Sequence, residues 1–495
     1  MPITNDEVLE LARDALAKML HDNGPNYTFP FDAIWQNTPP EIDIPSGSRP
    51  HQSKPLIKEG YIEKTGEMTR AVSEKRAGSA TPAYRFGPRL VPPQAAPPTA
   101  AAATAADRPS DLLKLMQQAM DSKGYLISSA ELANFFLAMT VSPLVILSGI
   151  SGTGKSLLPR LFAESTGSMF APIPVQPQWS DNSDLFGYVP TLSPDTFVRG
   201  RLIKSLLQAK ENENTLVVAL LDEMNLAPVE HYFSDFLSVA ETRARRAGAV
   251  VTDELPIELP TAPATGEDPD ADLRKICLPP NLRIVGTANM DETTHSFSPK
   301  VLDRAFTIEL DDPELTAFAS GEFESFASTE TLAILASSIV NKSNAISVLE
   351  ARAHNQALFD QIAVMLQEIK EILAPAGIKF GYRTRDAILL YLHFWRQMDL
   401  ADILTSNAAL DYCLLQKILP KISGSGQVLE DALENLSKWL KKDRSATDSD
   451  DSDDTGFGLS ASVGEFTGPF TRCVLKVNRM KALLVADGAT HYWGT

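Results

Sequence analysis

The sequence predicts an α/β fold with a parallel sheet, preceded by a small α+β module and followed by a mainly helical region. Short apolar runs typical of strands, LVILSG (144–149), TLVVALLD (215–222) and NLRIVGT (281–287), are separated by long helical or loop segments. This alternation is typical of a parallel sheet with crossover helices. After residue 312 the strand signals fade, and apolar residues recur at helical spacing.

The composition excludes several classes of protein. The 495 residues include 45 Lys and Arg against 63 Asp and Glu, a formal net charge of −18, which argues against nucleic-acid binding by the whole surface but not by a local basic patch. The 3 cysteines are far apart and predict neither a disulfide framework nor a zinc site. No apolar run approaches the ~20 residues that span a bilayer, so we expect no membrane segment and a cytoplasmic location.

Residues 1–90 are predicted to form a winged-helix-like module for recognition or interaction. Apolar residues at helical spacing in NDEVLELARDALAKMLHD are followed by short helical segments and a possible hairpin that ends in PAYRFG. The Pro/Ala-rich residues 91–110 are expected to be a linker.

This module contains a basic stretch within an acidic chain. Residues 49–90 hold nine Lys or Arg and four acids, and nine minus four gives a local charge of +5. The basic residues are Arg49, Lys54, Lys58, Lys64, Arg70, Lys75, Arg76, Arg85 and Arg89. One hypothesis is that DNA docks its phosphate backbone on residues 49–90, and the other is that they form a solvated face on a protein-interaction module.

The segment GISGTGKS, residues 149–156, fits the phosphate-loop pattern GxxxxGK[ST]. It follows an apolar strand and precedes LLPRLFAEST, a plausible helix, which is the context that the pattern requires. Glycines let backbone N–H groups converge on phosphate oxygens, Lys155 reaches the β and γ phosphates, and Ser156 offers its hydroxyl to Mg²⁺. The predicted nucleotide-binding residues are Gly149, Gly152, Thr153, Gly154, Lys155, Ser156 and Leu157.

An acidic pair ends the strand in TLVVALLDEMN. Asp222 is expected to lie near the metal, together with Ser156, and Glu223 near the attacking water, which in-line hydrolysis of a γ phosphate requires. An apolar strand that ends in two acids is a weak signal alone, but it becomes strong downstream of a phosphate loop.

The third strand leads into the polar segment GTANMDETTHSFSPKVLDRA, residues 286–305. Asn289 is predicted to orient the attacking water or a phosphate oxygen as a polar sensor. Arg304 either reaches a neighbouring subunit's γ phosphate as an arginine finger or forms a surface ion pair with Asp303 or Asp311. A metal site is the alternative for three other side chains, although their spacing matches no recognised ligand pattern: Asp291, Glu292 and His295.

Residues 111–312 are therefore predicted to form the α/β nucleotide-binding core, and residues 313–495 a helical lid and C-terminal region. Helical periodicity is clear in NQALFDQIAVMLQEIKEIL, RDAILLYLHFWRQM and NAALDYCLLQKIL. The acidic, serine-rich residues 443–458 predict a solvated loop.

Together these motifs resemble the AAA+ ATPases, and in detail the dynein-related and MoxR-like branch that includes the McrB-type motor subunits of modification-dependent restriction systems. The resemblance extends from near Leu112 to the end of the chain. Similar sequences carry, in the same order, GISGTGKS, W-D-x-x-D-L-x-G-Y, DEMNLA, GT-x-N-x-DETT, FSPKVLDRA, GYR, QKILPK-x-x-G and a late RM…L…G…YW ending.

The resemblance implies an AAA+ P-loop core with a helical lid, and a nucleoside triphosphatase that uses Mg²⁺ with ATP or GTP. The implied roles are Lys155 and Ser156 for triphosphate and Mg²⁺, Asp222 for Mg²⁺ through water, Glu223 as catalytic base, Asn289 as sensor 1 and Arg304 as the finger acting in trans.

The resemblance also implies roles for a residue of the lid and for an aromatic segment of the core. Arg383 in GYRTRD is implied as a sensor-2-like contact from the lid, and Arg385 competes for this role because both begin an apparent helix. Residues 179–188 are implied to face the pore of a ring or its substrate. The alternative is that their aromatic side chains form a plug between core and lid.

The resemblance leaves the base and the partner open. The best-known related restriction motor hydrolyses GTP and has MNTADRS where ANMDETT stands here, but most of the class uses adenine and the chain has no NKxD element, which favours ATP. The resemblance implies a homo-oligomeric ring, a hexamer, that acts on DNA in antiphage defence. Because the chain shows no nuclease constellation, we expect cutting to require a separate McrC-type nuclease subunit. The alternatives are a MoxR-like chaperone ATPase that remodels a protein complex, and a nucleotide-regulated scaffold without sustained turnover.

Overall fold

The structure is a computed structural model in which the chain forms two compact units, Met1–Ala103 and Thr104–Thr495. It describes residues 8–9, 11–13, 15–16, 18–19, 28–36, 38, 53–58, 61–70, 80–86, 108–246, 249–263, 268–290, 294–310, 316, 328–341, 346–444 and 465–493. Side chains are left out at 28, 36, 53, 63–70, 80–83, 85 and 86. No helix among these residues is both long and apolar enough to cross a membrane.

The N-terminal unit combines short helices with an antiparallel sheet. Its elements are β1 (Thr28–Pro30), α2 (Ala33–Gln36), α3 (Ser53–Lys58), β2 (Ile62–Arg70) and β3 (Ala80–Phe86), and the described residues between 8 and 19 are helical. The strand order is β1-β3-β2, so the predicted hairpin is present. Leu16, Phe29, Ile34 and Leu56 are fully buried in a small core. The winged-helix interpretation stays a prediction.

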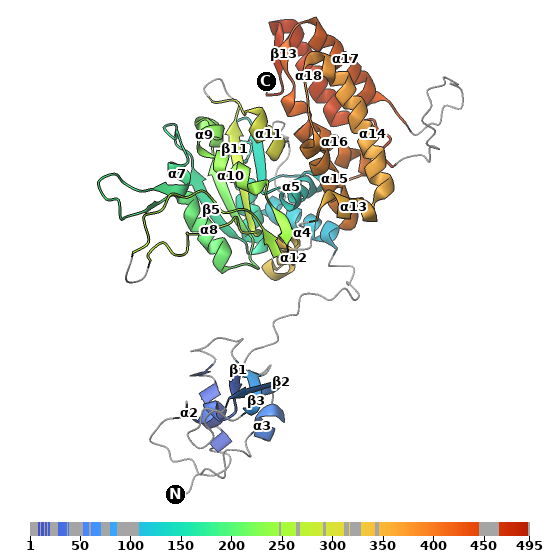
Figure 1. The fold of residues 1–495 in the computed structure, drawn as a ribbon. Helices are drawn as coiled ribbons and strands as arrows, with labels where there is room; N and C mark the ends of the chain where they lie inside the picture. Colours follow the sequence, from blue (N-terminus) through green and yellow to red (C-terminus); the bar gives the residue numbers. More distant parts are fainter. Residues whose placement is uncertain are drawn as a thin grey trace. The chain divides into compact units, whose positions relative to one another are not determined.

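Five parallel strands form the central sheet of the second unit (Figure 1). They are β4 (Leu144–Gly149), β5 (Met169–Pro174), β8 (Val217–Asp222), β11 (Leu282–Asn289) and β12 (Phe306–Glu309). Their spatial order is β12-β4-β11-β8-β5, so β11 lies between β4 and β8. All three strand segments predicted from sequence are confirmed.

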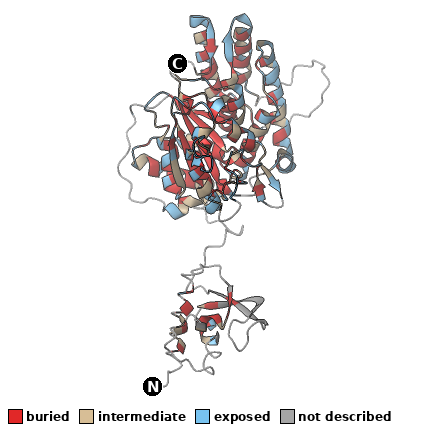
Figure 2. Cartoon of the chain, turned by 60° about the vertical axis from the view of Figure 1, so that its left-hand side comes forward, coloured by how far each residue is buried: buried red, intermediate tan, exposed pale blue. Residues whose placement is uncertain are grey.

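Helices cover both faces of this sheet. They are α4 (Pro109–Ser122), α5 (Ser129–Val141), α6 (Leu157–Thr166), α7 (Ser183–Phe186), α8 (Arg201–Glu211), α9 (Val229–Tyr232), α10 (Ser234–Ala240), α11 (Pro299–Arg304) and α12 (Thr329–Val340), with a short 3-10 helix η2 (Met224–Leu226). Along β4, Val145 and Leu147 pack into one apolar cluster, and Leu144 and Ile146 into another. A strand buried on both faces needs such a continuous apolar run, and Figure 2 shows the strands buried between helices with exposed outer faces.

The edge strand β5 is protected from pairing with a further strand. The backbone N–H groups of Met169 and Val175 donate to the carbonyls of Leu216 and Asp222, on the side of β8. Because successive N–H groups of a strand point to opposite sides, those of the even-numbered residues face away from β8. Two of these outward positions are Pro172 and Pro174, which have no N–H to donate. Prolines at an edge block the addition of another chain, so the sheet ends at β5.

The C-terminal part is a helical domain that packs against the sheet. It contains α13 (Val348–His354), α14 (Gln356–Leu373), η4 (Ala374–Ala376), α15 (Tyr382–Gln397), α16 (Ser406–Lys417), η5 (Leu419–Lys421), α17 (Gln427–Lys441) and α18 (Thr471–Asp487). A small antiparallel pair joins β13 (Ser423–Ser425) to β14 (Ala489–His491). Tyr391 of α15 stacks on Phe306 of β12 with ring centroids 5.8 Å apart.

The predicted fold class, an α/β AAA+ P-loop core with a parallel sheet and a helical lid domain, is confirmed by this arrangement. The three predicted C-terminal helices correspond to α14, α15 and α16. One difference concerns α12, which the sequence grouped with the lid. It packs on α4, α5 and α6 beside the sheet, because Leu332 and Leu335 join the apolar cluster there. Of the predicted acidic loop 443–458, residues 445–458 lie outside the described residues.

Candidate functional site

The phosphate-binding loop begins where β4 ends, at Gly149, and leads directly into α6. Gly152 and Gly154 have positive φ angles of 90° and 82°, a conformation that glycine adopts without a Cβ clash. A Cβ at position 154 would overlap the ring of Tyr125, which is buried against the loop. The loop thus turns tightly and directs its backbone toward the N-terminus of α6, as anion binding requires.

The remaining predicted loop residues hold this turn together. Thr153 donates from Oγ1 to the Ile150 carbonyl at 3.0 Å, and the N–H of Leu157, the first residue of α6, donates to Gly154 at 3.0 Å. Lys155 is buried, and its Nζ donates to the carbonyls of Gly149 (3.0 Å) and Ile150 (2.6 Å). The structure therefore places these residues in a tight turn between β4 and α6, and their role in nucleotide binding stays a prediction.

Ser156 meets the first carboxylate of the acidic pair. Its Oγ donates to Oδ1 of Asp222, at the end of β8, over 2.6 Å. The same Oδ1 accepts a hydrogen bond of 2.8 Å from Oγ1 of Thr287 on β11. A hydroxyl and a carboxylate oxygen side by side are ligands that suit Mg²⁺, which is bound by few protein groups and keeps several waters. The residues present therefore fit the expected Mg²⁺ site.

Glu223 is held in an unusual backbone conformation beside this pair. Its φ of 53° lies in the left-handed region, which non-glycine residues rarely occupy and which is often found at functional sites. Its N–H donates to Thr287 Oγ1 at 2.8 Å, and the Asn289 amide donates to its Oε1 at 3.2 Å. Because β11 lies between β4 and β8, its last residue, Asn289, is paired with Gly149 on one side and lies beside the two acids on the other.

Two residues without a predicted role organise this cluster. Thr287 connects Asp222 with Glu223, as described above. Asn225 is fully buried, and its Nδ2 donates to the Asn289 carbonyl at 2.7 Å, which ties the turn after β8 to the end of β11. The motifs DEMN and GTAN did contain both residues, but neither motif indicates which side chains meet across the sheet.

Arg304 lies at the opposite end of the sheet from its own phosphate loop. Its carbonyl accepts a hydrogen bond of 3.2 Å from Ser142, before β4, whereas the loop follows Gly149 at the other end of this strand. A strand of this length spans roughly 17 Å at ~3.3 Å per residue. The Arg304 side chain therefore cannot reach the phosphate loop of its own subunit.

The ion-pair partner of Arg304 differs from the two expected ones. Its guanidinium pairs with Glu241, which follows α10, and also donates to the Lys300 carbonyl at 2.7 Å. Asp303 pairs instead with Lys421, and Asp311 lies outside the described residues.

Arg383 shares the Glu241 carboxylate with Arg304. The Arg383 guanidinium lies 2.8 Å from Glu241 Oε1, so the first turn of α15 brings it to the end of α11. Arg385 instead pairs with the adjacent Asp386 at 2.7 Å and lies 4.7 Å from the Tyr382 ring centroid. The structure thus groups Arg383, and not Arg385, with the predicted finger.

The aromatic segment 179–188 divides between core and surface. Trp179 is buried, and its ring meets Tyr232 of α9 edge-on with a centroid distance of 5.2 Å. It belongs to the apolar cluster below the sheet, so it is not a plug between core and lid. Tyr188 in β6 (Gly187–Tyr188) is half exposed, and the loop from there to β7 (Val198–Arg199) exposes Leu192 almost completely.

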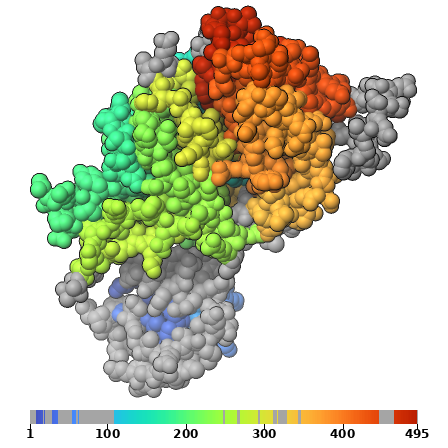
Figure 3. Space-filling view, turned by 45° about the horizontal axis from the view of Figure 1, so that its top comes forward, coloured from blue at the N-terminus to red at the C-terminus, as the bar shows by residue number. Residues whose placement is uncertain are grey.

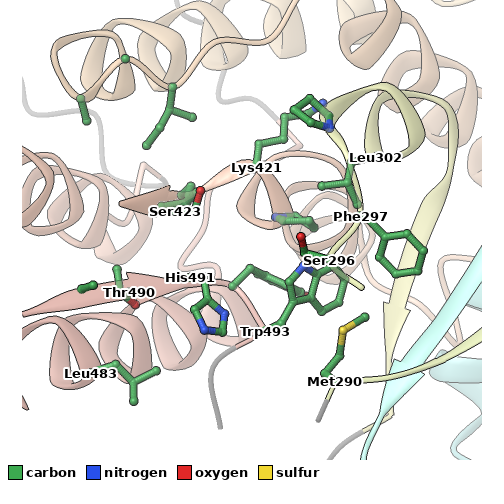
Figure 4. A pocket seen from close by; sticks show the side chains of 18 of the residues that line it. Met290, Ser296, Phe297, Leu302, Lys421, Ser423, Leu483, Thr490, His491 and Trp493 are labelled. Atoms are coloured by element: carbon green, nitrogen blue, oxygen red, sulfur yellow. The ribbon is translucent and has the colours of Figure 1, made fainter. Parts of the chain in front are cut away.

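A cavity of about 970 Å³ lies between the segment after β11 and the C-terminal hairpin (Figure 4). His295, Phe297 and Leu302 line one side, and Lys421 and Trp493 belong to the other. Two residues of the alternative metal site, Asp291 and Glu292, lie outside the described residues. The third, His295, donates its backbone N–H to the Asn225 carbonyl at 2.9 Å.

Comparisons with known proteins add little detail. A family described only as a domain of unknown function, DUF8727, matches residues 331–489, which is less than half of the chain and lies in the helical part. No curated protein matches. A solved structure of a "putative ATPase" from Cytophaga hutchinsonii ATCC 33406 is similar at 14% identity and a TM-score of 0.36, covering 63% of this chain and 88% of that one. At that TM-score, the fold assignment rests on the sheet order and the loop described above.

Proposed function

We propose that this chain is an AAA+ nucleoside triphosphatase that binds Mg²⁺ and a triphosphate at residues 149–156. The observation that carries the proposal is the continuous hydrogen-bonded set formed by Ser156, Asp222, Thr287, Glu223 and Asn289. It brings two hydroxyls, two carboxylates and an amide together at the mouth of a phosphate loop, from the start of α6 and from the ends of the adjacent strands β8 and β11. ATP is the favoured substrate and GTP the alternative.

The chain's own residues divide the chemistry among them. Backbone N–H groups of the loop and Lys155 bind the phosphates, and Ser156 with Asp222 would hold Mg²⁺, which supplies charge neutralisation of the phosphate oxygens. Glu223 takes the proton from the attacking water. Asn289, hydrogen-bonded to Glu223, fixes the carboxylate and the water relative to the γ phosphate.

The position of Arg304 supports a nucleotide site shared between subunits. Since Arg304 and Arg383 both lie at Glu241 and away from their own phosphate loop, we infer that both serve the nucleotide of a neighbour. Both guanidinium groups are partly exposed at Glu241, so a phosphate of a neighbouring subunit's nucleotide can compete with this carboxylate for them. A closed ring of subunits, a hexamer, satisfies this geometry at every site.

At the level of the whole protein, we propose an McrB-like motor that acts on DNA with a separate McrC-type nuclease subunit in antiphage defence. The motifs from near Leu112 to the end support this resemblance. In the N-terminal unit, α3 exposes Lys54 and Lys58 while burying Leu56, which leaves two charges on the surface for phosphates. The other basic residues of the stretch 49–90 lie outside the described residues or have undescribed side chains.

Steady-state hydrolysis of ATP and GTP, measured side by side with and without DNA and the nuclease subunit, tests this proposal. We expect turnover that DNA or the nuclease stimulates. The stimulation should weaken steeply with salt and be reduced by Lys54→Glu together with Lys58→Glu, because counterion release drives phosphate binding. Stimulation by a protein partner alone would favour the chaperone alternative, and no turnover under any condition would contradict the enzymatic proposal.

Thr287→Val should slow hydrolysis roughly 30–150-fold, since it removes two hydrogen bonds of ~1–1.5 kcal/mol each around the acids. Valine has nearly the same shape, so nucleotide binding should persist. The matched control is Thr307→Val on β12, because the buried Thr307 hydroxyl meets no hydrogen-bond partner within the described part of the chain. Equal rates for both variants would show that Thr287 does not organise the site.

A further inference from the structure

At the end of α11, which carries Arg304, one side chain of the helical domain binds three backbone carbonyls. Lys417, the last residue of α16, donates from Nζ to the carbonyls of Leu302 (3.4 Å), Asp303 (2.9 Å) and Ala305 (2.6 Å). The last carbonyls of a helix have no partner within it, and lysine is suited to bind them because it offers three donors. Together with the Ser142 bond to Arg304, every carbonyl from 302 to 305 is bound.

This contact is buried and reinforced. Lys417 is about 1% exposed, and its Nζ lies 5.0 Å from the centroid of the Phe306 ring, the residue that opens β12. Burial is the main cause that lowers the pKa of the Lys417 amine to about 7. From η5, Lys421 pairs with the carboxylate of Asp303, the residue directly before Arg304. The helical domain therefore binds backbone carbonyls on both sides of Arg304.

These lysine contacts lie where the α/β core and the helical domain of the second unit meet. Figure 3 shows the yellow segment around α11 against the orange and red helical domain, and α11 packs on α15 and η5. The cavity beside it is lined by Leu302 and Asp303 of α11 and by Lys421 of the helical domain (Figure 4). Here Lys421 pairs with Asp303, and Lys417 binds the carbonyls at the end of the helix.

We propose that Lys417 is a positioning residue for Arg304: it fixes the end of α11 to the helical domain, so that the placement of this domain sets where the arginine is offered to the neighbouring subunit. The proposal rests on the shared-site function proposed above. A displacement of about 1 Å in a catalytic group can cost ~10²-fold in rate. Loss of the Lys417 contacts should therefore impair the neighbour's site and spare the subunit's own.

Complementation between subunits tests this role. Full-length Lys417→Met alone should hydrolyse nucleotide at least about tenfold more slowly, with unchanged affinity for a fluorescent nucleotide analogue. Mixed with Glu223→Gln, whose Arg304 is intact, it should recover activity. Mixed with Arg304→Ala it should not, because neither subunit then offers a well-placed arginine. The double variant Arg304→Ala/Lys417→Met should be no slower than Arg304→Ala.

Lys476→Met is the matched control. Lys476 is another buried lysine of the helical domain, but it pairs with Glu309 of β12 and lies 4.4 Å from the Tyr492 ring centroid. Its variant should recover activity with Arg304→Ala. If Lys417→Met unfolds at the assay temperature, Lys421→Met takes its place in the experiment. Lys421→Met leaves only the partly exposed carboxylate of Asp303 without its ion pair, and the same complementation pattern is expected.

Two results would overturn the proposal in different ways. If Glu223→Gln and Arg304→Ala recover together but Lys417→Met recovers with Arg304→Ala and not with Glu223→Gln, Lys417 serves its own subunit's site. If Glu223→Gln and Arg304→Ala do not recover at concentrations that assemble rings, the shared site itself is wrong, and the role of Lys417 falls with it.

Discussion

Glu223→Gln should lower the steady-state rate of nucleoside triphosphate hydrolysis by roughly 10²–10⁴-fold, the range lost with a general base, while nucleotide binding remains. Glutamine has the same size and keeps an oxygen that can accept the Asn289 amide, now 3.2 Å from Glu223 Oε1. It cannot accept a proton from water. The loop residues and the Ser156–Asp222 pair are unchanged, so the affinity for triphosphate and Mg²⁺ should stay close to that of the unaltered protein.

Paired measurements of turnover and of binding to a fluorescent nucleotide analogue check this expectation. Glu211→Gln is the control. Glu211 is exposed at the end of α8, so this substitution removes the same negative charge at a position away from the phosphate loop. A rate for Glu223→Gln within a few-fold of the control would show that another group takes the proton. A matching loss of affinity would indicate that Glu223 supports the loop and does not act in catalysis.

Arg304→Ala should reduce hydrolysis by about 10³–10⁵-fold, as expected for an arginine finger, and the lost activity should return on mixing with Glu223→Gln. The physical reason is that Arg304 lies beside the N-terminal end of β4, whereas its own phosphate loop follows the C-terminal end of this strand, which is roughly 17 Å long. In a mixed ring, some sites combine an intact Glu223 from one subunit with an intact Arg304 from the next.

The two arginines in the first turn of α15, Arg383 and Arg385, sharpen this test. Arg383→Ala should share the behaviour of Arg304→Ala and recover only with Glu223→Gln, because both side chains pair with Glu241. Arg385→Ala, whose partner Asp386 is its own neighbour, should change the rate little. Recovery on mixing Arg304→Ala with Arg383→Ala would place the two arginines at different sites and contradict their grouping.

The sequence alone was sufficient for the features that depend on consecutive residues. The run LVILSG corresponds to β4 residue for residue, and LLPRLFAEST corresponds to α6, because a buried parallel strand requires unbroken apolar residues and the loop between them requires glycines at fixed positions. The acids at the end of β8 and Asn289 at the end of β11 follow in the same way, since each directly ends an apolar run.

The tertiary structure alone decided which of these residues meet. Periodicity gives the strands but not the order β12-β4-β11-β8-β5, which inserts Thr287 and Asn289 between the loop and the acids. Neither the ion-pair partner of Arg304 nor the lysine that binds the carbonyls on either side of it was predictable, for the same reason. Glu241 precedes it by 63 positions and Lys417 follows it by 113, and no local pattern links residues that only packing between separate elements brings together.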